Sequence, residues 1–216
     1  MAIALGSIHK VRSRARERLG LSCGIRGNGW CVTHALLDKM PYRSFSLTED
    51  VEFGVDLGLA GYRVAYCDES HVNGEMVTSE QASRSQRQRW EGGRIALIRE
   101  KVPALLRAAV ARRSLVCLDL ALDLLVLPLS YVVVNVGAII AIAALNADGF
   151  RSALLTLGLL DTVALAIYVC RGWQISGIGI VGILDLLRVP VFLFWKLLLI
   201  RFHPKPNAWI RTKRER

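Results

Sequence analysis

Two patterns of apolar and polar residues divide this 216-residue chain. In residues 1–113 apolar positions recur at helical or alternating spacing among many charges, whereas residues 114–201 are almost continuously apolar. The first pattern is typical of half-buried elements in a soluble domain, and the second is typical of membrane helices. A short and strongly basic tail follows at residues 202–216. The sequence therefore predicts a partial soluble domain, a membrane region and a tail.

The front part of the chain alternates predicted helices with predicted strands. Three short segments have the apolar or alternating pattern of strands, namely residues 30–33, 62–66 and 72–77. Helices are predicted at residues 13–18, 34–40 and 48–60, and the glycine-rich stretch 19–29 is predicted to be a loop. This order favours an α/β unit in which two or three short strands pack against helices.

Two capping boxes mark further helix starts. Residues 46–49, SLTE, fit the S/T-x-x-E pattern and precede apolar residues at helical spacing. Residues 78–81, TSEQ, fit the same pattern and open a helix that carries Gln86, Arg89 and Trp90. We therefore expect the candidate polar residues described below to lie on regular helices.

The apolar region contains three tracts. Residues 115–145 exceed the about 20 residues that one span needs, so we expect the first turns of this tract at the membrane interface. Residues 154–170 follow after a tight polar loop, and the two tracts predict a helical hairpin. The third tract, residues 175–200, is interrupted by Asp185, Arg188, Pro190 and Lys196.

The basic tail sets the expected topology. Basic segments stay on the cytoplasmic side of a membrane, and an even number of spans keeps the front domain on that side too. Two spans with an interfacial or re-entrant third tract satisfy this condition, whereas three full spans do not. We therefore expect a multi-pass protein of the inner (plasma) membrane with a cytoplasmic front domain and a cytoplasmic tail.

The net charge of +10 is compatible with nucleic acid, an anionic bilayer or a phosphorylated substrate as partner. The long apolar region favours the bilayer. No helix-turn-helix, zinc-finger spacing or aromatic RNA-binding signature occurs in the sequence. We therefore expect membrane lipid, and no nucleic acid, among the partners.

The first group of candidate residues is Glu49 and Asp50, adjacent carboxylates at a predicted helix start. Such residues also occur there for a structural reason, because acidic side chains complement the helix dipole and Glu49 suits the capping box. The second group is Gln86, Arg89 and Trp90, which share one helix face by their i, i+3 and i+4 spacing. Arg89 offers a planar fork for phosphate oxygens, and Trp90 offers a flat surface for a sugar ring. The structural alternative is a solvated basic helix with Trp90 anchored on the core or at the membrane interface.

The two groups together resemble a known family. A TED followed some three dozen residues later by QxxRW is similar to the membrane-integrated family 2 glycosyltransferases, the group containing cellulose, chitin and hyaluronan synthases. The resemblance covers residues 19 to 216, through SCGIRGNGWC, SLTED, AGYRVAYCDES, SQRQRWEGGR, the apolar region and the closing WIRT. It implies the C-terminal half of a GT-A-like fold followed by a transmembrane hairpin and interfacial helices.

The resemblance also implies residue roles. Asp50 matches the general base that accepts the proton of the acceptor hydroxyl, a task that suits a carboxylate. Arg89 matches the residue that stabilises the departing diphosphate. The substrate-binding set that the resemblance implies is Glu49, Gln86, Arg89, Trp90, Gly27, Asn28 and Gly29.

A divalent metal, Mg or Mn, is also implied, held by a DxD motif in the nucleotide-binding half. No DxD precedes Gly24, so we expect that this chain alone does not turn over sugar nucleotide. Three alternatives stay open: a truncated gene product, a fragment, or one part of a split enzyme in which a separate chain supplies the nucleotide-binding half. Asp119 and Asp123 are four residues apart, which suits a metal pair, but a helix emerging at an interface explains them better. We therefore predict no metal site among the residues of this chain.

These features lead to one principal hypothesis and one alternative. The principal hypothesis is an inverting hexosyltransferase of polysaccharide biosynthesis that moves sugar from a nucleotide donor to a glycan or lipid-linked acceptor. The alternative is a non-catalytic membrane partner or remnant that binds an intact glycosyltransferase, or anionic lipid, through its basic face. An enzyme needs Asp50 and the face of Gln86, Arg89 and Trp90 to converge on one pocket, whereas a scaffold does not.

Overall fold

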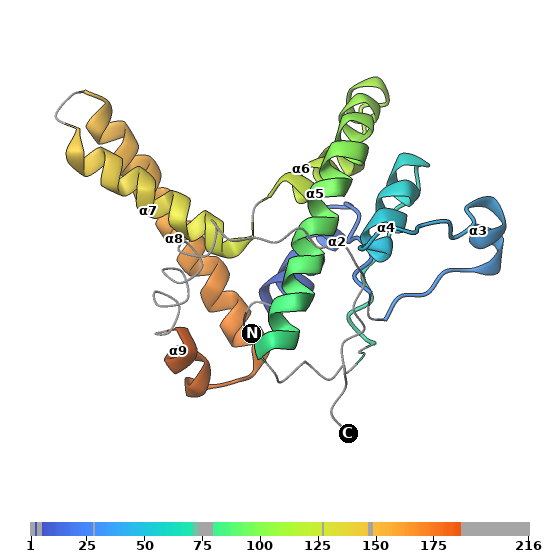
Figure 1. Cartoon of the computed structure of the whole chain (residues 1–216), viewed down its shortest axis with the longest axis horizontal. Helices are drawn as coiled ribbons and strands as arrows, with labels where there is room; N and C mark the ends of the chain where they lie inside the picture. Colours follow the sequence, from blue (N-terminus) through green and yellow to red (C-terminus); the bar gives the residue numbers. More distant parts are fainter. Residues whose placement is uncertain are drawn as a thin grey trace. The chain divides into compact units, whose positions relative to one another are not determined.

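The computed structural model describes residues 3, 6–27, 29–70, 72, 80–126, 128–146 and 149–186. These residues form helices and irregular segments that divide into two compact units (Figure 1). The described residues from 14 to 126 are here called the front unit, and residues 3–13 with 128–186 are called the hairpin unit. The domain boundaries predicted at residues 113 and 201 stay predictions.

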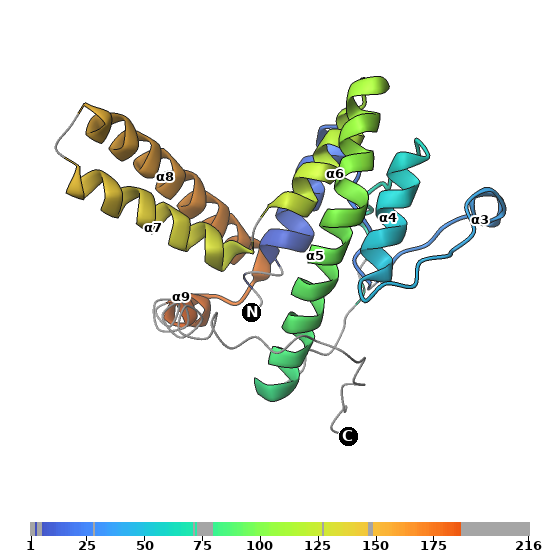
Figure 2. The ribbon, with the colours of Figure 1, turned by 45° about the horizontal axis from the view of Figure 1, so that its top comes forward.

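The front unit is built on three long helices that lie side by side (Figure 2). Its helices are α2 (Arg12–Arg18, from Arg14 onward), α3 (His34–Lys39), α4 (Glu49–Leu59), α5 (Glu80–Ala111) and α6 (Leu115–Leu125). The core between α4, α5 and α6 includes Val55, Leu97, Leu105, Leu120 and Leu124, all nearly inaccessible to solvent. Burial of this apolar surface is the main force that holds the three helices together.

A second buried cluster joins the glycine-rich loop to α4. Ile25, Phe53 and Leu57 form its centre, and apolar side chains of α3 pack against it. Gly54 allows the loop to approach, because a Cβ atom at this position would lie 3.0 Å from the Ile25 backbone nitrogen. The loop at residues 19–29 is therefore fixed on α4 although it contains no regular element.

The hairpin unit contains two antiparallel helices, α7 (Leu129–Leu145) and α8 (Phe150–Ser176), together with the π-helical turn η1 (Gly6–Val11) and α9 (Ile180–Leu186). Close packing of α7 and α8 depends on Gly158, where a Cβ atom would lie 2.7 Å from Ile140 Cγ1. By length and apolarity α8 can cross a membrane, and α6 and α7 pass the same test as a pair.

The helices predicted at residues 13–18, 34–40 and 48–60 occur in the structure within one residue of their predicted bounds, and the described residues of 19–29 form a loop. The hairpin is also present, but α8 is four residues longer at its start and six residues longer at its end than the predicted tract 154–170. The predicted tract 115–145 is divided near Pro128, the N-cap residue of α7, because proline has no N–H to continue the ladder of α6. Of the third apolar tract, α9 is described to Leu186; the rest of that tract and the basic tail lie outside the described residues.

The predicted strands are not found where the structure can test them. Residues 30–33 and 62–66 have no regular secondary structure, so neither forms the predicted strand within the described ranges. Cys23 donates its N–H to the Val64 carbonyl at 2.9 Å, while the Val64 N–H donates to the Ser22 hydroxyl. A β-ladder needs repeated hydrogen bonds between two backbones. Here the second hydrogen bond of Val64 goes to a side chain, so no ladder forms. The predicted strand at 72–77 lies outside the described residues except for Val72, so the α/β class is not confirmed.

Candidate active site

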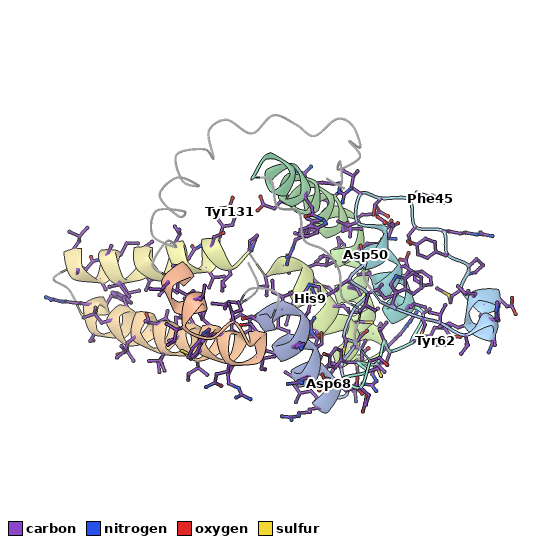
Figure 3. All side chains as sticks on the ribbon, turned by 90° about the horizontal axis from the view of Figure 1, so that it is seen from below. His9, Phe45, Asp50, Tyr62, Asp68 and Tyr131 are labelled. Atoms are coloured by element: carbon purple, nitrogen blue, oxygen red, sulfur yellow. The ribbon has the colours of Figure 1, made fainter. Side chains whose placement is uncertain are left out.

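Asp50 is the second residue of α4, whose N-cap is Thr48. Its side chain is half-buried in the front unit (Figure 3). Burial, the largest effect, and the neighbouring charge of Glu49 raise the pKa of Asp50 above its usual range. Backbone N–H groups of the helix start and the charge of Arg26 oppose this rise. The result is a carboxylate that accepts a proton more readily than an ordinary surface aspartate.

The cap of α4 differs from the predicted capping box. Glu52, not Glu49, reaches back to accept the Ser46 N–H at 3.1 Å, and the Thr48 side chain makes no cap hydrogen bond. Lys101 of α5 lies 3.7 Å from the Glu52 carboxylate and 2.9 Å from that of Asp56. The capping role predicted for Glu49 is therefore wrong, whereas its place in the first turn of α4, where an acidic side chain complements the helix dipole, is confirmed. The Glu49 side chain is exposed beside Asp50.

Gly27 brings the glycine-rich loop against Asp50. Its φ is +72°, and a Cβ atom at Gly27 would lie 3.0 Å from Asp50 Oδ2. Gly29 also has a positive φ, +74°, and a Cβ atom there would lie 2.5 Å from Val72 Cγ2. Only glycine adopts such backbone conformations at little cost. Asn28, predicted with them, lies outside the described residues.

The motif helix α5 presents Gln86, Arg89 and Trp90 toward the side on which it packs. With 100° between successive residues, these three share a face with Gly93 and Leu97. Leu97 is buried in the core of the front unit. A Cβ atom at Gly93 would lie 2.8 Å from Thr48 Cγ2, so Gly93 seats α5 against the start of α4.

Two atoms of the motif are buried without a hydrogen-bond partner among the residues that the structure describes: Gln86 Oε1 and Arg89 Nε. Trp90 keeps 41% of its surface exposed. Buried polar atoms are usually paired in native proteins, and a bound group or water can pair with this acceptor and donor. The contact of Gly93 with Thr48 is one of those that join the helix of Arg89 to the start of α4, where Asp50 lies.

Two features of this region were missed by sequence reasoning. Arg94 donates from Nε to the Leu124 carbonyl at 2.9 Å and from Nη2 to the Asp123 and Val126 carbonyls, so it caps the end of α6. The sequence feature that could have indicated this cap is the arginine that follows the two glycines of EGGR. The second feature is an aromatic cluster of Trp30, Tyr42 and Phe53.

Asp119 and Asp123 are held by arginine. Arg16 Nε lies 2.9 Å from Asp119 Oδ2, and Arg16 Nη2 lies 3.1 Å from Asp123 Oδ1. In the described ranges no three His, Cys, Asp or Glu side chains group in a way that could hold a metal ion. The described residues thus do not fit the divalent metal that the family resemblance implies, and we derive no step through it.

Comparison with known families places the chain. Residues 2–169, more than three quarters of the sequence, match the model of the family described as glycosyl transferase family group 2. The chain belongs to this family. No curated protein and no solved structure matches it. Membership of this family indicates glycosyl transfer as the reaction class. The helical front unit is therefore part of a glycosyltransferase domain.

Proposed function

We propose that this chain forms the acceptor side of an inverting glycosyltransferase that moves a sugar from a nucleotide donor to a glycan or lipid-linked acceptor at the membrane. The observation that carries the proposal is the environment of Asp50. A half-buried carboxylate with a raised pKa lies against a glycine-lined loop, in the same unit as the helix of Gln86, Arg89 and Trp90. Proton acceptors with a pKa shifted toward neutrality are typical of catalytic sites.

In this proposal Asp50 acts as the general base. Its carboxylate takes the proton of the acceptor hydroxyl while that oxygen attacks the anomeric carbon, and the bond from this carbon to the diphosphate oxygen breaks. The electron pair leaves with the diphosphate, and attack from the opposite side inverts the anomeric centre. Gly27 leaves room at the carboxylate that a side chain would fill.

Arg89 and Gln86 serve the departing diphosphate. Arg89 supplies a planar cation whose N–H groups match phosphate oxygens. Because this cation is already in place, it stabilises the negative charge that develops on the departing diphosphate. Gln86 adds an amide that can donate as well as accept. Glu49 and Trp90, both exposed beside this region, contribute to binding the sugars.

The proposal includes a membrane location with the front unit on the cytoplasmic side. The length and apolarity of α8 and the basic residues Arg112 and Arg113 before α6 support this orientation. A reaction at the bilayer surface suits an acceptor that is lipid-linked or that leaves through the membrane.

The proposal is tested with Asp50→Asn in native membranes of cells that carry the variant in place of the original gene. Incorporation of labelled sugar from a panel of nucleotide sugars is measured. Loss of the general base should lower the rate about 10²–10⁴-fold. Glu49→Gln is the matched control, because it removes the adjacent carboxylate without removing the base, and its rate should fall far less.

The pH profile gives a second readout. Because the pKa of Asp50 is raised, wild-type activity should decline as the pH falls through a value above the ordinary aspartate range. The same shift means that ionised Asp50 costs stability above that pKa, so Asp50→Asn should unfold no more easily than wild type at neutral pH. Full activity of Asp50→Asn, combined with loss of activity on deletion of the gene, would favour the non-catalytic partner instead.

A further inference from the structure

Three aromatic rings of the front unit form one cluster on the helix that carries Asp50. Trp30 and Tyr42 are stacked, with ring centroids 5.8 Å apart and planes 25° apart. Both contact Phe53, at centroid distances of 5.8 and 4.9 Å. Phe53 is 1% exposed, whereas Trp30 and Tyr42 each keep 40% of their surface exposed. A buried ring therefore supports two rings that face outward.

The cluster lies next to the candidate base. Phe53 follows Asp50 by three residues, which is about 4.5 Å along the axis of α4. Trp30 follows Gly27 by three residues, and Gly27 abuts the Asp50 carboxylate. Burial, and then the charges of Glu49, Asp50 and Glu52, raise the pKa of the Tyr42 hydroxyl, so these carboxylates lie near enough to act on Tyr42 through their charge.

The combination of rings and carboxylates matches the chemistry of a sugar. A pyranose ring has an apolar face of C–H groups, which packs on the electron-rich face of an aromatic ring, and an edge of hydroxyl groups, which donate to carboxylates. The negative charges of Glu49 and Asp50 disfavour an anionic sugar by repulsion. The fitting ligand is a neutral glycan.

We propose that Trp30 and Tyr42 form a platform that binds the neutral sugar rings of the acceptor glycan beside Asp50. This inference rests on the proposed function, because it names the substrate class of the same site. It adds two binding residues that lie outside the TED and QxxRW motifs. The platform holds the acceptor so that its terminal hydroxyl reaches the base.

The test uses the full chain, purified in detergent micelles, and calorimetric titration with neutral probes: cellotetraose, chitotetraose and mannotetraose. Tri-galacturonate is the anionic probe. At least one neutral tetraose should bind wild type more tightly than the anionic probe does. Trp30→Ala and Tyr42→Ala should each weaken that binding about tenfold, and Trp30→Phe should restore most of it. Phe45→Ala is the matched control, since Phe45 is an aromatic residue of the same segment that is 89% exposed.

Folding is checked by circular dichroism. If an alanine variant does not fold, Trp30→Leu and Tyr42→Leu, which keep an apolar side chain but remove the aromatic ring, are titrated in its place and should weaken binding in the same way. Unchanged binding in Trp30→Ala and Tyr42→Ala, or no binding of any neutral tetraose to wild type, would overturn the proposal. The proposal would also be overturned if Trp30→Ala and Tyr42→Ala lost association with phosphatidylglycerol vesicles but kept sugar binding, because the rings would then contact the membrane.

The two proposals fail separately. If Trp30→Ala loses tetraose binding while Asp50→Asn keeps full transfer, the platform stands and the assigned base is rejected. If Asp50→Asn loses transfer while Trp30→Ala keeps wild-type binding and a wild-type KM for the acceptor, the base stands and the platform is rejected.

Discussion

The front unit and the hairpin unit pack by opposite rules. In the front unit the contacts are made by large apolar side chains, and Leu97 and Leu105 are essentially inaccessible. In α8 of the hairpin unit the buried residues are Gly158 and Gly172, whereas large residues such as Leu159 are 65% exposed. Water drives large apolar side chains inward, whereas lipid does not, and helices in lipid approach through small residues. The packing of α8 is therefore the kind that the proposed membrane location predicts.

Charge follows the same division. In the front unit Lys101 and Arg16 bind carboxylates on neighbouring elements and are mostly shielded from solvent. In α8 a Thr162 hydroxyl donates to the Gly158 carbonyl one turn earlier, so its polar group is satisfied within the helix. A helix that satisfies its own polar groups can contact hydrocarbon, whereas the front unit relies on pairing between elements.

The largest effect is expected from Arg16→Met in the front unit. The Arg16 side chain is 8% exposed and its guanidinium is shared by Asp119 and Asp123, so its removal leaves two half-buried carboxylates without their nearest cation. The free energy of unfolding should fall by about 3–5 kcal/mol. Denaturant unfolding of the micelle-bound chain, followed by tryptophan fluorescence, measures it.

Arg14→Met is the control for that change. Arg14 pairs with Asp68 in an exposed bridge, which should contribute about 0–1 kcal/mol. Equal losses in the two variants would contradict the view that burial of the charges decides their contribution.

Leucine truncation compares the two units directly. Leu105→Ala empties a fully buried position of the front unit and should cost about 2–5 kcal/mol of unfolding free energy. Leu159→Ala on the exposed side of α8 should change stability by at most about 0.5 kcal/mol. Both are measured in the same micelles; a large loss for Leu159→Ala would mean that this face packs against protein, not lipid.

Replacing glycine by a large residue should destabilise the hairpin unit, in which truncating an exposed leucine should not. Gly158→Leu places atoms where Ile140 already lies and should cost about 1–3 kcal/mol. Gly137→Leu on α7 is the control, because a Cβ atom there meets nothing within 4 Å. Thermal unfolding of the hairpin in lipid nanodiscs compares them, and similar midpoints would show that α7 and α8 do not pack closely there.

Several elements were predictable because their signals are local. The helix predicted at residues 48–60 follows from a polar start and apolar spacing, and the helix that carries Gln86, Arg89 and Trp90 follows from a polar start; both occur in the structure. The predicted strands at residues 30–33 and 62–66 were wrong because a strand depends on a partner that the sequence does not name. The capping role was assigned to Glu49 wrongly for a related reason, since Glu52 lies six residues after Ser46 and only the bent entry to α4 brings them together.

The sequence by itself determined the motif residues, the face shared by Gln86, Arg89 and Trp90, and the separation of a charged part from an apolar part. These depend on residue order and helical periodicity, which act over a few residues. The tertiary structure alone decided that Gly27 meets Asp50, that Gly93 seats α5 on Thr48, and that Arg16 holds the two aspartates of α6. Such contacts join residues distant along the chain, and they arise from packing of whole elements, which no short stretch of sequence encodes.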